Sequence, residues 1–292
     1  MYVGRFAPTP SGPLHFGSMV TAVGSFCDAK SQSGKWLIRI DDLDHERKVE
    51  GADTEIFRVL ESFSLTWDDE PIYQSQQRQY YEDWLTEFGV KIDCYPCICS
   101  RKVLRQRSIQ VNEEWAYNGY CRTHPIINGT IRNYRIKLNN PSITSINDTA
   151  LGSISQDLHA LYGDFVVFKS DGTPSYHLAS VLDDHNAGVT DIVRGRDLLS
   201  SSLRQAAIQK ILGYPTQNFL HIPLVRNEKG QKLSKQNKAR PINTEHVTET
   251  LIKVLHFLSQ DPPRELCDAT STEILSWAVH HWNPLLTATD NP

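Results

Sequence analysis

The sequence predicts an α/β protein built around a parallel β-sheet. Short apolar strand patterns alternate with helical patterns near the N-terminus and again after residue 160, and this alternation is typical of βαβ units. The chain has 292 residues, of which 39 % are hydrophobic and 22 % charged, enough for about two domains with buried cores. This composition excludes disordered, collagen-like and coiled-coil proteins.

The N-terminal region supplies the first two strand–helix units. Residues 2–7 predict a buried strand that ends at the proline-rich run 8–13, because proline cannot continue a strand ladder. A helix follows, and residues 36–40 and 51–63 predict the next strand and helix. The apolar side chains that share one face of the first helix at 3.6-residue spacing are Met19, Val20, Val23, Phe26 and Cys27.

The rhythm changes in the middle of the chain. Between residues 76 and 159, charge-rich helical pieces, a cysteine cluster and a polar run replace the alternation, so we interpret this range as an insertion. Strand and helix patterns resume at residues 164–169, and a lysine-rich stretch at 226–240 leads to two helices, the second capped by Ser271 or Thr272. The predicted units are a sheet domain split between 1–75 and 160–225, an insertion at 76–159, and a lysine-rich loop with a helical subdomain at 226–292.

Charge and hydropathy limit the classes of partner. A net charge of −4 and a pI near 6.3 exclude a protein that coats nucleic acid by bulk charge, although a local basic patch remains compatible. No apolar stretch approaches the ~20 residues that cross a bilayer, and the N-terminus lacks a signal-peptide pattern. We therefore expect a cytoplasmic monomer without membrane contacts.

The cysteines favour a metal site. Disulfides are not expected in the cytoplasm, and four of the six cysteines fall between residues 94 and 121.

Two short strings have the chemistry of phosphate binding. His15, Gly17 and Ser18 lie where the first helix begins, and a helix N-terminus attracts phosphate through its unpaired N–H groups and partial positive charge. Gly17 would allow a nucleotide to approach the backbone closely. Lys232 and Lys235 flank a hydroxyl in the second string, and mobile ammonium groups can follow shifting phosphate oxygens. Taken alone, each string is more often an ordinary loop.

Together and in this order, the two strings resemble the HIGH and KMSKS motifs of the class I aminoacyl-tRNA synthetases. The run Arg5-Phe6-Ala7-Pro8-Thr9-Pro10-Ser11-Gly12, with residues 40–44, 183–185 and 193–195, is similar to the glutamate branch of that family. The resemblance covers residues 1–240. It implies a Rossmann-like catalytic domain, a zinc-bearing insertion and a small helical C-terminal piece, with His15 and Lys235 as catalytic residues. It further implies an ATP site formed by His15, Gly17, Ser18, Lys232, Ser234 and Lys235, with Mg²⁺ brought by ATP.

The resemblance also implies a glutamate site. Its residues would be Arg5, Phe6, Ala7, Pro8, Thr9, Asp41, Tyr176 and Arg194. Arginine can bind a carboxylate through two parallel N–H groups, which suits Arg5 and Arg194. Asp41 offers a countercharge for the ammonium group, but the family usually has glutamate here, and the shorter acid reaches ~1.5 Å less.

Length indicates one branch of the family. Only 52 residues follow Arg240, whereas a full glutamyl-tRNA synthetase continues into anticodon-binding domains. The chain is similar in this respect to the short glutamyl-queuosine tRNA(Asp) synthetases, ligases that activate glutamate without tRNA and esterify it to queuosine in the anticodon. The implied partners are ATP, L-glutamate and queuosine-containing tRNA(Asp). Three alternatives stay open: a truncated glutamyl-tRNA synthetase that charges a 3′ end, a non-catalytic RNA-binding paralogue, and a ligase that makes a small-molecule amide.

The cysteine cluster completes the predicted sites. Three thiolates and one further ligand make a tetrahedral zinc site, but C-x-C is tighter than the common C-x₂-C spacing. The same branch carries a Cys, Cys, Tyr, Cys set with Y-x-G-x-C, so the resemblance implies one structural zinc ion held by Cys97, Cys99, Tyr117 and Cys121. The alternative is a group of buried cysteines without metal.

Overall fold

The computed structural model describes residues 1–88, 93–111, 114–124, 126, 129–226 and 240–288. The strands are β1 (Val3–Phe6), β2 (Lys35–Ile40), β3 (Ile72–Tyr73), β4 (Cys94–Cys97), β5 (Ser108–Val111), β6 (Glu114–Tyr117), β7 (Asn133–Ile136), β8 (Ile143–Asp148), β9 (Gly152–Asp157), β10 (Val166–Lys169), β11 (Asp191–Gly195) and β12 (Asn218–Ile222). The α-helices are α1 (Phe16–Ser31), α2 (Ala52–Ser62), α3 (Arg78–Phe88), α4 (Arg101–Arg107), α5 (Tyr120–Thr123), α6 (Leu158–Tyr162), α7 (Tyr176–Asn186), α8 (Leu199–Leu212), α9 (Val247–Phe257) and α10 (Ser271–His281). Short 3₁₀ helices are η1 (Gln74–Gln77), η2 (Arg196–Leu198), η4 (Arg264–Asp268) and η5 (Pro284–Ala288). Among the described helices, none has the length and apolar character to cross a membrane.

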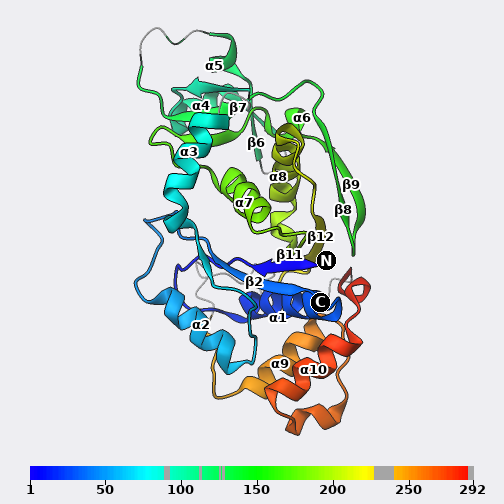
Figure 1. Cartoon of the computed structure of the whole chain (residues 1–292). Coiled ribbons are helices and arrows are strands. Elements are labelled where there is room, and N and C mark those ends of the chain that lie inside the picture. Colours follow the sequence, from blue (N-terminus) through cyan, green and yellow to red (C-terminus); the bar gives the residue numbers. More distant parts are fainter. Residues whose placement is uncertain (89–92, 112–113, 125, 127–128, 227–239, 289–292) are drawn as a thin grey trace.

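A parallel sheet forms the centre of the molecule (Figure 1). β1, β2 and β3 pair in parallel, and so do β11, β12 and β8. The two groups meet where the backbone N–H of Thr190 donates to the carbonyl of Val3 at 2.9 Å. Because helices connect these strands, the predicted parallel α/β fold is confirmed.

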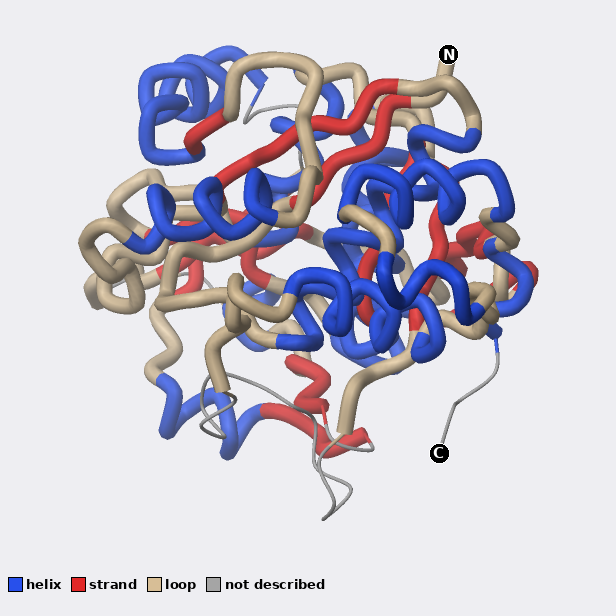
Figure 2. Tube along the Cα trace, turned by 90° about the horizontal axis from the view of Figure 1, so that it is seen from below, coloured by secondary structure: helices blue, strands red, loops and turns tan. Residues whose placement is uncertain are grey.

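Both faces of this sheet are covered, as the view from below also shows (Figure 2). Successive strand residues point to opposite faces, so Trp36 and Ile38 join the core with α1, whereas Leu37 joins the core with α7 and α8. In the same way, Val193 and Ile192 of β11 face opposite cores. This double burial explains why the strands are apolar runs without polar alternation.

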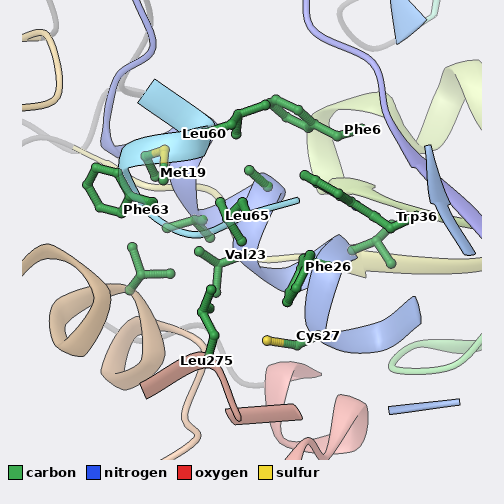
Figure 3. Packing of buried hydrophobic residues seen from close by; sticks show 14 of the residues in the cluster. Phe6, Met19, Val23, Phe26, Cys27, Trp36, Leu60, Phe63, Leu65 and Leu275 are labelled. Atoms are coloured by element: carbon green, nitrogen blue, oxygen red, sulfur yellow. The ribbon is translucent and has the colours of Figure 1, made fainter. Parts of the chain in front are cut away.

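Helix α1 lies between the sheet and the C-terminal helices α9 and α10 (Figure 1). Val23 and Cys27 of α1 are fully buried and belong to the same core as Trp36 of β2 and Leu275 of α10 (Figure 3). The indole N–H of Trp36 donates to the Ser25 hydroxyl at 3.0 Å, so its burial leaves this donor satisfied. The C-terminal helices therefore complete the core of the sheet domain.

The middle of the chain differs from the predicted boundaries. β10, expected to resume the parallel sheet at residues 164–169, instead pairs antiparallel with β7, which pairs antiparallel with β4. Its apolar run would suit either sheet, because periodicity does not identify a partner strand. Conversely, β8 lies within the expected insertion yet pairs with β12 through Asp148 and Phe219. The buried face of β8 includes Thr144 and Asp148, which hid its strand pattern.

Helix α10 is capped by Thr270, one residue before Ser271 and Thr272, the two caps predicted from the sequence. The Thr270 hydroxyl accepts the N–H of Glu273 at 3.4 Å, and the Glu273 carboxylate accepts the N–H of Thr270 at 2.8 Å, which forms a capping box. Residues 270–272 all carry hydroxyl groups, and the glutamate three residues later selects the first of them. Ser271 instead lies 2.7 Å from the Ser64 hydroxyl.

We predict that Thr270→Ala lowers the free energy of unfolding by about 1 kcal/mol, because it removes this cap. Ser276→Ala is the matched control, since Ser276 is an exposed residue of the same helix, and its effect should stay within about 0.5 kcal/mol. Urea unfolding of both variants measures the difference. Equal stability of the two variants would contradict the capping role.

Candidate active site

A cleft of about 330 Å³ opens at the carboxyl ends of β1 and β11, which is where open α/β sheets bind ligands. The structure brings most of the predicted nucleotide and glutamate residues together here. Those that line the cleft are Arg5, Phe6, Ala7, Pro8, Thr9, His15, Gly17, Ser18, Tyr176 and Arg194. Lys232, Ser234 and Lys235 lie outside the described residues.

The N-terminus of α1 faces the cleft through His15. Its Nδ1 accepts the N–H of Ser18 at 3.3 Å, so the imidazole caps the helix. A side chain at Gly17 would meet this ring, because an added Cβ would lie 3.2 Å from its Cε1 atom. Glycine at this position therefore lets the imidazole lie against the first turn of the helix. The sequence predicted a different role for Gly17, the close approach of a nucleotide to the backbone.

The described residues on either side of 227–239 both lie at the cleft. Val225 lines it, and Pro241 forms a β-bridge with His15. The N–H of Ile242 also donates to the carbonyl of Leu14 at 2.9 Å. Described residues on both sides of 227–239 are thus anchored at the cleft.

One end of the cleft rests on a buried ion network. Arg5 donates to both carboxylate oxygens of Asp184, at 3.0 and 3.3 Å, and Arg39 donates to Oδ1 of the same carboxylate at 2.6 Å. All three side chains are buried. Burial opposes ionisation of Asp184, but the two guanidinium groups more than offset it and hold its pKa below the usual range.

Asp41, predicted to bind the substrate ammonium group, is not among the described residues that line the cleft. It belongs to the same network, because Arg39 donates to its Oδ1 atom through Nε at 2.7 Å. Burial raises the pKa of Asp41 despite this contact with Arg39. In the structure Asp41 thus orients Arg39, and its contact with the substrate ammonium group stays a prediction.

Asp183 lies next to this network, but its hydrogen-bond donors are neutral groups, whereas those of Asp184 are arginines. It accepts hydrogen bonds from the Gln74 amide at 2.7 Å and the Tyr81 hydroxyl at 2.8 Å. Burial raises the pKa of Asp183 to about 6, and Arg39 opposes this rise from 3.9 Å. Sequence reasoning missed Arg39, although a charged residue inside an apolar strand is the signal of a buried ion pair.

Arg194 is bound in a different way from Arg5. It is 3 % exposed, and its Nε and Nη2 atoms donate to the hydroxyl of Ser202, with a second bond from Nη2 to the Gln205 carbonyl at 2.8 Å. Its Nη1 atom makes no hydrogen bond within the part of the chain that the structure describes. Burial lowers the pKa of Arg194 to about 10, so it stays charged at neutral pH.

The cysteine cluster lies at the end of the molecule opposite α9 and α10 (Figure 1). The thiols of Cys97, Cys99 and Cys121 are buried and lie within 4.8 Å of one another. The Tyr117 hydroxyl lies 3.8 Å from the Cys97 sulfur and 3.7 Å from the Cys99 sulfur. Gly119, with φ of 74°, makes the turn that brings Cys121 back to this group.

This geometry fits a tetrahedral metal. Zn–S bonds of about 2.3 Å and a Zn–O bond of about 2.0 Å predict ligand–ligand separations of about 3.5–3.8 Å. The Cys99 and Cys121 sulfurs are 3.5 Å apart. Arg107 and Arg135 donate to the Cys99 and Cys97 sulfurs at 3.5 and 3.3 Å, contacts that favour thiolates. The three thiols can therefore hold a metal ion.

Comparison with known proteins gives the family. Residues 2–257 match the sequence profile of a family described as tRNA synthetases class I (E and Q), catalytic domain. The fold and the cleft therefore define a class I synthetase catalytic unit. A crystal structure of glutamate-tRNA synthetase from Elizabethkingia anophelis shares this fold with a TM-score of 0.81 at 23 % identity, and the match covers 99 % of this chain and 67 % of that one.

Curated relatives are more similar in sequence. The glutamyl-Q tRNA(Asp) synthetase of Aromatoleum aromaticum is 42 % identical over 282 residues, which cover 97 % of this chain and 89 % of that protein. The glutamyl-Q tRNA(Asp) synthetase of Neisseria gonorrhoeae is 41 % identical over 290 residues, with 97 % and 96 % covered. The chain belongs to the glutamyl-Q tRNA(Asp) synthetase family, and the resemblance seen in the sequence is confirmed.

We predict that Asp184→Ala lowers the free energy of unfolding by about 3–5 kcal/mol, because it leaves two buried guanidinium groups without their shared carboxylate. Asp44→Ala is the control, since it also removes an aspartate paired with an arginine, Arg47, but at an exposed site that should contribute about 0–1 kcal/mol. Urea unfolding compares them. A loss below about 1 kcal/mol for Asp184→Ala would show that the network does not support the fold.

Proposed function

We propose that this chain activates L-glutamate with ATP, without tRNA, and transfers the glutamyl group to queuosine in the anticodon of tRNA(Asp). The observation that carries the proposal is Arg194, a buried guanidinium held by neutral groups at a cleft that also contains the N-terminus of α1. A ligand that joins a carboxylate to phosphates satisfies both features. The names of the curated relatives identify the reaction class.

Glutamate would bind with its side-chain carboxylate on Arg194. Burial strengthens a charge-assisted hydrogen bond. Arg194 lines the cleft, and its buried Nη1 atom has no hydrogen-bond partner among the described residues. Arg5 lies in the same cleft but already shares the carboxylate of Asp184, so it would supply positive potential and a fixed wall. Tyr176 and the segment Phe6–Thr9 would form the remaining contacts.

In the first step an oxygen of the α-carboxylate attacks the α-phosphorus of ATP. A new O–P bond forms, the bond to the β-phosphate oxygen breaks, and pyrophosphate leaves with that electron pair. No protein nucleophile is required, so positioning and charge stabilisation supply the catalysis. His15 and the first turn of α1 would face the phosphates, and Lys232, Ser234 and Lys235, outside the described residues, would close over them. Mg²⁺ accompanies ATP as its counterion.

In the second step a hydroxyl of the queuosine cyclopentene diol attacks the carbonyl carbon of the glutamyl adenylate. An ester bond forms, AMP leaves with the bonding electrons, and the hydroxyl proton is released. A vicinal diol is also what a tRNA 3′ end offers, so the same adenylate chemistry serves either acceptor.

The metal that we propose for the cysteine cluster is one zinc ion, held by Cys97, Cys99, Tyr117 and Cys121. Thiolate-rich tetrahedral sites favour zinc. Four protein ligands leave no open position, and the site lies away from the cleft, so the ion would shape the insertion and take no part in the reaction. Sulfur–sulfur and sulfur–oxygen separations of 3.5–3.8 Å support this proposal.

We predict about one zinc ion per purified chain by elemental analysis, and a loss of at least half of it in Cys121→Ser, because one of four ligands is removed. Cys94→Ser is the matched control: Cys94 begins the same strand as Cys97 but is not part of the cluster, so zinc content should not change. A wild-type protein prepared without chelators that holds no metal would refute the zinc site.

The acceptor is tested by the position of labelled glutamate on RNA. We predict that glutamate-dependent ATP–pyrophosphate exchange occurs without tRNA, and that nuclease digestion places the label in the anticodon fragment of tRNA(Asp). A tRNA pool from cells that do not make queuosine is the control and should receive no label. Label on the 3′-terminal adenosine would instead identify a truncated glutamyl-tRNA synthetase, and no exchange would identify a non-catalytic paralogue.

A further inference from the structure

A buried chain of hydrogen bonds runs from Arg194 to a carboxylate that does not touch it. The hydroxyl of Ser202, which accepts from Arg194, lies 2.6 Å from Nε2 of His221. On the other side of the ring, Nδ1 lies 2.6 Å from Oδ2 of Asp148. Ser202, His221 and Asp148 are buried and come from α8, β12 and β8.

The protons along this chain can be assigned from its acceptors. Asp148 accepts the backbone N–H groups of His221 at 2.9 Å, Ala150 at 2.9 Å and Leu151 at 2.7 Å. Burial opposes its charge, but hydrogen bonds from His221 and Leu151 hold the pKa of Asp148 below the usual range. Burial lowers the pKa of His221, so the imidazole is neutral at pH 7. An ionised carboxylate only accepts, so the single ring proton lies on Nδ1 and Nε2 has a lone pair.

This assignment determines how Ser202 meets the guanidinium group. A hydroxyl has one proton and two lone pairs. The proton of Ser202 has two acceptors within reach, Nε2 of His221 at 2.6 Å and the Leu198 carbonyl at 3.1 Å. With either acceptor, both lone pairs of the hydroxyl remain for the Nε–H and Nη2–H groups of Arg194. With the opposite imidazole tautomer, Ser202 would face three donors with two lone pairs, and Arg194 would lose a bond.

The side chains that accept hydrogen bonds from Arg194 are neutral, namely the Ser202 hydroxyl and the Gln205 carbonyl, and the charge of Asp184 acts on Arg194 without a direct hydrogen bond. Arg5 and Arg39, by contrast, donate to carboxylates in the same part of the molecule. A carboxylate in contact with Arg194 would hold the guanidinium equally well but would compensate the charge that a substrate carboxylate needs. Asp148 supplies its negative charge two groups away, where it fixes a proton without pairing directly with Arg194.

We propose that Asp148, His221 and Ser202 are positioning residues that hold Arg194 at the cleft through neutral contacts, so that its Nη1 atom can donate to the side-chain carboxylate of the substrate. This inference rests on the proposed function, because it takes glutamate as the ligand of Arg194. It adds Asp148 of β8, His221 of β12 and Ser202 of α8 to the determinants of amino-acid affinity.

Two variants break the chain at different points and are measured by glutamate-dependent ATP–pyrophosphate exchange. Ser202→Ala removes the acceptor of Arg194, and Asp148→Asn removes the charge that fixes the His221 tautomer. Each should raise the KM for glutamate at least tenfold and leave the KM for ATP within twofold. Ser201→Ala, which removes a neighbouring buried hydroxyl of α8, is the control and should leave both constants unchanged. Equal effects on glutamate and ATP would indicate a general structural role and overturn the proposal.

Gln205→Glu tests whether the partners of Arg194 must be uncharged or need only hold the guanidinium group in place. This variant remains informative if the first two variants fail to fold. The change is nearly isosteric and gives Nη2 of Arg194 a carboxylate partner. If the neutrality of the contacts matters, the KM for glutamate rises at least tenfold; if Arg194 only needs to be held, the KM is unchanged and the proposal fails. Wild-type protein without glutamate-dependent exchange would refute the proposed function itself, which distinguishes the two failures.

Discussion

The carboxylate of Asp184 is the constraint on which the site depends. It accepts from Arg5 of β1 and from Arg39 of β2 while it is itself carried by α7. Three buried charges would destabilise the fold without one another, so the two strands and the helix must meet in one arrangement. That arrangement brings the end of β1 beside α7 and so creates the wall of the cleft on which Arg5 and Tyr176 lie.

The two arginines that line the cleft are buried with different kinds of partner. Arg5 is compensated by a carboxylate, whereas Arg194 is held by a hydroxyl and an amide carbonyl. Among the described residues Arg194 therefore has no carboxylate hydrogen-bond partner, although both guanidinium groups line the same space. Residue type alone does not reveal this asymmetry, because it follows from which partners each side chain meets.

The parts that could be predicted from sequence depend on local pattern. The strand at residues 2–7, the helix with His15 before it, and the convergence of Arg5, Tyr176 and Arg194 follow from short motifs, periodicity and family resemblance. Contacts between distant residues could not be predicted. Nothing near Asp148 indicates that its partner is His221, 73 residues later, and the apolar run of β10 does not show which sheet it joins. The pairing of Asp41 with Arg39 could not be predicted either, because both residues lie at the end of one strand and their contact depends on how the side chains pack.

The pairing of β8 with β12 limits which segments of this chain could be exchanged with those of a related protein. Asp148 ends β8 within the range 76–159 that the sequence marks off as a separate piece, yet its carboxylate contacts His221 of the central sheet. A graft that replaced 76–159 as a single cassette would exchange the cysteine cluster and also cut this connection to Arg194. A cut placed before β8 would keep this connection but would place the β7–β10 pairing across the new junction. The segment that carries the cysteine cluster is therefore joined to the rest of the chain on both sides of β8, and neither boundary frees it as an independent piece.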